Sequence, residues 1–66
     1  MLDKKQVAAT EVEVMRLFGH LPDIHARVRG GVYTYEVQVF TPRCQNVGRG
    51  ESLPAALLHL KRLNNL

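Results

Sequence analysis

The clearest pattern in the chain is the alternation of apolar and polar residues from 24 to 40. Two alternating runs meet at Gly30-Gly31, a pair of glycines that can adopt the positive φ of a tight hairpin turn. Placing the turn there pairs apolar residues across the strands: Val28 with Tyr33, Ala26 with Tyr35 and Ile24 with Val37. The polar pairs are Arg27 with Thr34 and His25 with Glu36. A shift of one residue would mix the two faces, so the pattern predicts a hairpin in this register.

A helix is predicted before the hairpin, over about residues 2–19. Its apolar residues recur at steps of three and four: Val7, Ala8, Val12, Met15 and Phe18, with Val14 beside them. Asp3 is the predicted N-cap and Gly19 the predicted end. Leu21-Pro22 then interrupts the helix, because proline lacks an N–H and biases the residue before it toward extended geometry.

The C-terminal segment predicts a second helix. Ser52 is a favourable N-cap, and Pro54 lies in the first turn, where its missing N–H does no harm. One apolar stripe runs along the segment: Leu53, Ala56, Leu57, Leu60 and Leu63. Leu58 and Leu66 flank that stripe and widen it.

Between the hairpin and this helix, Thr41-Pro42-Arg43 predicts a turn. Residues 44–47 are a candidate third strand, ended by Gly48-Arg49-Gly50. The predicted fold is a single α+β domain over residues 1–66, in the order α-β-β-(β)-α. It has a small antiparallel sheet of two or three strands, with both helices packed on one face. Tyr33 and Tyr35 are then expected in the core beneath the helices, and the open edges of the sheet favour self-association.

Composition narrows the class of protein. A chain of 66 residues has little room for an enclosed active site, so we expect a non-enzymatic protein without a cofactor. Cys44 is the single cysteine, which excludes an internal disulfide and suits a reducing compartment. Neither a signal peptide nor a membrane span is apparent, and we expect a soluble, cytoplasmic protein.

The charge is distributed unevenly. Residues 1–23 carry three basic and four acidic side chains, a net of −1, whereas residues 24–66 carry six basic and two acidic ones, a net of +4. The basic residues of the second part are Arg27, Arg29, Arg43, Arg49, Lys61 and Arg62. They indicate either a solvated, solubilising surface or a surface for phosphates or carboxylates.

Other chemistry is weakly supported by the sequence. His20, His25 and His59 show no spacing typical of metal ligands, and we expect no metal site. Cys44 lies beside an arginine but lacks an adjacent base in the sequence, so we interpret it as a small structural residue. The segment 48–52 has glycines before a helix but no P-loop lysine, which favours a turn followed by an N-cap over a phosphate loop.

From about residue 14 to 63 the layout resembles the double-stranded-RNA-binding domain. Residues 35–39 are similar to that family's second strand, and Gly48-Arg49-Gly50-Glu51-Ser52 is similar to its G-x-G-x-S entry to the final helix. The resemblance implies an α-β-β-β-α fold and contact with duplex RNA. Where the family carries phosphate-binding lysines, however, this chain has Leu53, Pro54 and Leu57. Its short Gly30-Gly31 turn also lacks the histidine of the family's longer loop.

Two functional hypotheses follow. The first is a nucleic-acid-binding or regulatory module that contacts phosphates through the basic residues Arg27, Arg29, Arg43, Arg49, Lys61 and Arg62. The second is a protein-interaction module, as a homodimer or with another protein partner. Its expected interface residues are Phe40, Leu58 and Leu66.

Overall fold

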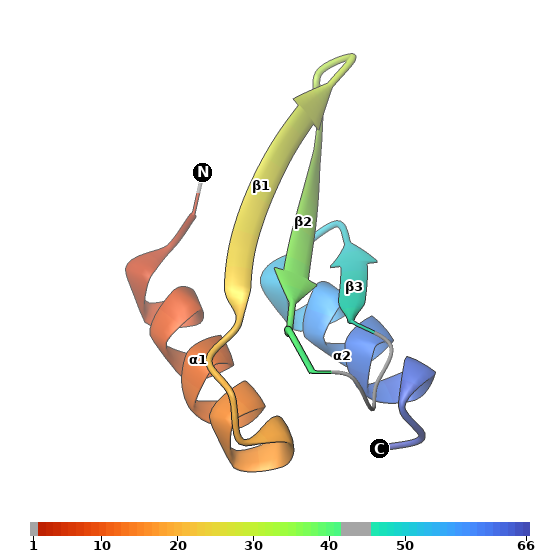
Figure 1. Cartoon of the computed structure of the whole chain (residues 1–66). Helices are drawn as coiled ribbons and strands as arrows, with labels where there is room; N and C mark the ends of the chain where they lie inside the picture. The colour runs from red at the N-terminus through yellow and green to blue at the C-terminus, as the bar shows by residue number, and fades with distance from the viewer. Residues whose placement is uncertain (1, 42–45) are drawn as a thin grey trace.

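The computed structural model describes residues 2–41 and 46–66. The elements in chain order are α1 (Lys4–Phe18), β1 (Asp23–Arg29), β2 (Val32–Gln38), β3 (Val47–Gly50) and α2 (Leu53–Leu63). The three strands form one antiparallel sheet in the order β1-β2-β3. α2 packs on one face of this sheet and α1 lies beside α2 (Figure 1). The predicted α+β fold is confirmed, with a third strand present.

The hairpin has the predicted register. Ile24 pairs with Val37, His25 with Glu36 and Val28 with Tyr33. Gly30 and Gly31 have φ of 58° and 78°. Positive φ at both central residues is the geometry of a type I′ turn, whose twist matches that of the flanking strands.

Both helices begin at the predicted caps. The Asp3 side chain accepts a hydrogen bond of 2.8 Å from the Lys5 N–H, and the Ser52 side chain accepts one of 3.2 Å from the Ala55 N–H. Gly19 ends α1 in the left-handed conformation, with φ of 73°. These local bonds satisfy N–H groups that the first helical turn leaves unpaired.

The third strand lies further along the chain than the sequence predicts. β3 includes Gly48 and Gly50, which were expected to end it, and Cys44 lies outside the described residues. The reason is the close approach of α2. A Cβ built on Gly48 would lie 2.3 Å from the Ala56 carbonyl oxygen, and one on Gly50 would lie 2.7 Å from the Ala56 nitrogen. These glycines therefore allow the backbone of α2 to rest directly on β3.

The core lies between the sheet and the two helices. Its fully buried apolar residues are Val14, Val37, Val39, Leu53, Ala56 and Leu60. The residues packed against them are Val7, Phe18, Ile24, Tyr35 and Leu57. Most of the predicted α2 stripe is thus confirmed, but Leu63, at the C-terminal end of the helix, is exposed.

The buried face of α1 differs from the predicted one. Thr10 and Val14 are buried, whereas Val12 and Met15 are 69% and 44% exposed. Thr10 is tolerated inside because its hydroxyl donates a hydrogen bond of 2.7 Å to the Gln6 carbonyl oxygen within the same helix. Thr10, with its hydroxyl hydrogen-bonded, therefore lies on the buried face of α1, although the spacing of apolar residues predicts Val12 and Met15 there.

The outer half of the hairpin projects beyond the helices. Figure 1 shows the turn between β1 and β2 standing clear of both α1 and α2, and β3 is only four residues long. Tyr33, predicted in the core, is consequently 46% exposed, while Tyr35 is partly buried. The two rings stack with centroids 6.3 Å apart. Among residues 2–41 and 46–66, no helix is long and apolar enough to cross a bilayer.

Candidate functional site

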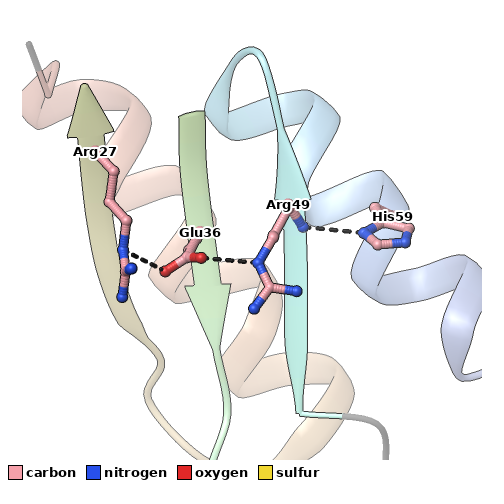
Figure 2. Close-up of polar contacts among 4 residues, drawn as sticks. All are labelled: Arg27, Glu36, Arg49 and His59. Carbon is pink, nitrogen blue, oxygen red and sulfur yellow. Dashed lines mark hydrogen bonds and ion pairs between the residues drawn. The ribbon is translucent and has the colours of Figure 1, made fainter. Parts of the chain in front are cut away.

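A row of charged side chains crosses the sheet on the face opposite the helices. Glu36 of β2 lies between Arg27 of β1 and Arg49 of β3 (Figure 2). The Arg27 Nε is 3.2 Å from the Glu36 Oε1, and the Arg49 Nε donates a hydrogen bond of 2.8 Å to the Glu36 Oε2. Each carboxylate oxygen is thus held by a different arginine.

Glu36 is the buried member of this row. The residue is 8% exposed, while the side chains of Arg27 and Arg49 are 72% and 59% exposed. The hydrogen bond from Arg49 lowers the pKa of Glu36 below its ordinary value of 4.5, against the opposing effect of burial, and the charge of Arg27 lowers it further. Glu36 is therefore a fixed anion that positions two arginines.

His59 of α2 extends the row to the edge of the sheet. Its Nδ1 accepts a hydrogen bond of 2.9 Å from the Arg49 backbone N–H (Figure 2). An accepting Nδ1 carries no proton, so the bond requires the neutral imidazole. This contact fixes the backbone of β3 at the residue whose side chain reaches Glu36.

A shallow hollow of about 540 Å³ lies over this row. It is lined by Arg27, Val28, Arg29, Thr34, Glu36 and Arg49. The three arginines and one carboxylate give the hollow a net charge of +2. Figure 2 shows the terminal nitrogens of Arg27 and Arg49 apart from the carboxylate, because both arginines approach Glu36 through Nε. Those terminal N–H groups are available to an anion in the hollow.

The structure brings together three of the six predicted basic residues: Arg27, Arg29 and Arg49. Lys61 and Arg62 lie on α2, across the sheet from the hollow. The Lys61 Nζ is 3.9 Å from the Glu13 Oε1 of α1, so it joins the two helices. Arg43 lies outside the described residues.

The predicted protein-interface residues are all exposed but are not consecutive on one element. Phe40 follows β2 and is 60% exposed, Leu58 lies on α2, and Leu66 is at the C-terminal end. In the part of the chain that the structure describes, no three or more His, Cys, Asp or Glu side chains are grouped to hold a metal ion.

Sequence reasoning missed the central role of Glu36. The hairpin register places His25 directly opposite it, and an ordinary pair with His25 was expected. That pair is present, but the Glu36 carboxylate also bonds to Arg49, which is its direct partner on β3. Only the correct position of β3 could have revealed this pair.

Comparisons with known proteins assign no family. No protein-family model matches the chain, and no curated protein or solved structure matches it significantly. The α-β-β-β-α topology stands on the structure alone.

Proposed function

We propose that the chain is a nucleic-acid-binding module that contacts backbone phosphates with the open face of its sheet. The observation that supports this most is the arrangement of Arg27 and Arg49 around Glu36. Both guanidinium groups are held through Nε, with their terminal N–H groups left for an anion. A positioned guanidinium loses less side-chain entropy on binding phosphate than a mobile one.

The remainder of the hollow suits the same ligand. Arg29 lies near the hairpin turn, on the same strand as Arg27 and two residues further on. Its side chain and the Thr34 hydroxyl add donors along the hollow. A shallow, open, basic surface fits an extended polyanion better than a small enclosed ligand.

The resemblance to the double-stranded-RNA-binding domain supports nucleic acid as the ligand class, but the proposed surface is different. In that family the contacts come from the final helix and the first hairpin loop. Here the start of α2 carries Leu53 and Pro54, and the proposed contacts lie on the opposite face of the sheet. We therefore propose general phosphate contact by the sheet, with little reading of base sequence.

The test is a titration of fluorescently labelled duplex and single-stranded DNA and RNA at low salt. We expect dissociation constants of about 1–100 µM, and for duplexes a fall in log K of about 0.9 per tenfold rise in salt for each phosphate neutralised. The double substitution Arg27→Ala with Arg29→Ala should weaken binding at least about tenfold and flatten the salt dependence.

Arg62→Ala is the matched control, because Arg62 is an exposed arginine on α2, away from the hollow. It should change the affinity little. Absence of binding to all four nucleic acids at about 100 µM protein would refute the proposal. An equal loss from Arg62→Ala and from the double substitution would show that the open face is not the binding surface.

A further inference from the structure

We infer that two copies of this chain associate through β1, edge to edge and antiparallel, about a two-fold axis at Ala26. The inference does not depend on nucleic-acid binding. It rests on the backbone groups, side-chain exposure and residue order of β1.

The two edges of the sheet differ in whether their outward-facing backbone groups are hydrogen-bonded. At the β3 edge, His59 accepts a hydrogen bond from the outward N–H of Arg49. At the β1 edge, the alternation of an antiparallel ladder directs the N–H and C=O of Ile24, Ala26 and Val28 away from β2. No hydrogen bond among residues 2–41 and 46–66 reaches these groups. Every residue of β1 except Ile24 is exposed, so most of the strand is open to solvent.

The residue order of β1 is complementary to itself. Pairing Ala26 with Ala26 of a second copy places Ile24 opposite Val28, so that each outward-facing pair can exchange both backbone hydrogen bonds. The smallest side chain then lies at the two-fold axis, where each residue faces its own copy. Apolar side chains meet on the helix side of the joined sheet.

Charges favour this register over those with the axis nearer the hairpin turn. About Ala26, Asp23 lies opposite Arg29 of the second copy at both ends of the strand pair, and His25 lies opposite Arg27. An axis at Arg27 would place Arg27 opposite Arg27 of the second copy. An axis at Val28 would place Arg27 opposite Arg29 of the second copy. Like charges directly opposite are destabilising, so the Ala26 register is favoured over these two.

The contact is limited to one strand from each copy, which is smaller than the interface of a stable complex. We therefore expect a dissociation constant between about 1 µM and 1 mM. Sedimentation equilibrium of the full chain should show the 7.5 kDa monomer at low concentration and its dimer at high concentration. Amide exchange at Ala26 should slow as the concentration rises.

Ala26→Pro tests the edge directly. The Ala26 N–H points away from β2, so proline in both copies removes the two central hydrogen bonds of the dimer but none of the hairpin. We expect the variant to be monomeric with the circular dichroism of the wild type. Leu58→Asp is the control, since Leu58 is exposed on α2; it should dimerise like the wild type.

A charge exchange keeps the inference testable if proline disturbs the strand. Asp23→Arg or Arg29→Asp alone places like charges across the axis and should weaken the dimer at least about threefold. The two substitutions together restore opposite charges and should restore it. A monomer at every concentration up to about 1 mM would overturn the inference. So would loss of the dimer in Leu58→Asp, or failure of the double exchange to recover it.

Discussion

Gly48 is the position where the packing of α2 on β3 can be tested most sharply. In Gly48→Ala the new Cβ would lie 2.3 Å from the Ala56 carbonyl oxygen and 2.7 Å from the Leu60 nitrogen. Both are backbone atoms of α2, so relief requires the whole helix to move away from the sheet. Overpacking of this kind costs about 3 kcal/mol.

A smaller effect acts in the opposite direction. Alanine restricts the unfolded chain more than glycine does, and this raises the free energy of unfolding by about 0.4–1 kcal/mol. The expected net loss is about 2 kcal/mol, out of a total stability of about 3–10 kcal/mol for a chain of this length. For so small a domain this corresponds to a fall in Tm of about 8–16 °C.

Thermal unfolding followed by circular dichroism measures the effect. Gly30→Asn is the control: a Cβ there meets no atom within 4 Å, and Asn-Gly is the preferred pair of a type I′ turn. It should leave Tm unchanged or raise it. If the Tm of Gly48→Ala lies within about 2 °C of the wild type, α2 does not rest on β3 as described.

Two further predictions concern the core and the charged row. Leu60→Ala should cost about 2–5 kcal/mol in urea unfolding because Leu60 is fully buried, whereas exposed Leu58→Ala should cost less than about 1 kcal/mol; equal losses would contradict the described core. Glu36→Gln should be less stable than the wild type at pH 7, because the wild-type carboxylate has a lowered pKa. That advantage is present above the ordinary pKa of 4.5 and is lost as pH falls through the lower pKa of the folded state, so the two proteins should converge in acid. A difference independent of pH would contradict the ion pairs of Glu36.

The sequence by itself determined the features that depend on residues close together in the chain. The hairpin register follows from the alternation on either side of Gly30-Gly31, and the structure has that register. The caps Asp3 and Ser52 bond to N–H groups two and three residues away, so their signals are also local. For such features the pattern and the interaction occupy the same few residues.

The tertiary structure decided the features that depend on how α2 approaches the sheet. Gly48 and Gly50 belong to β3 because α2 rests on them, although glycines more often end a strand. Docking of α2 also left the outer hairpin uncovered, which exposes Tyr33.

The charged row at the candidate site has the same origin. Arg49 reaches Glu36 across 13 positions of sequence and His59 across 10, and both contacts exist only once β3 pairs with β2 and packs against α2. The apolar periodicity of a helix or strand does not indicate which residues of other elements it will contact. The sequence therefore indicated the basic residues, but the docking of α2 on β3 determined which of them meet.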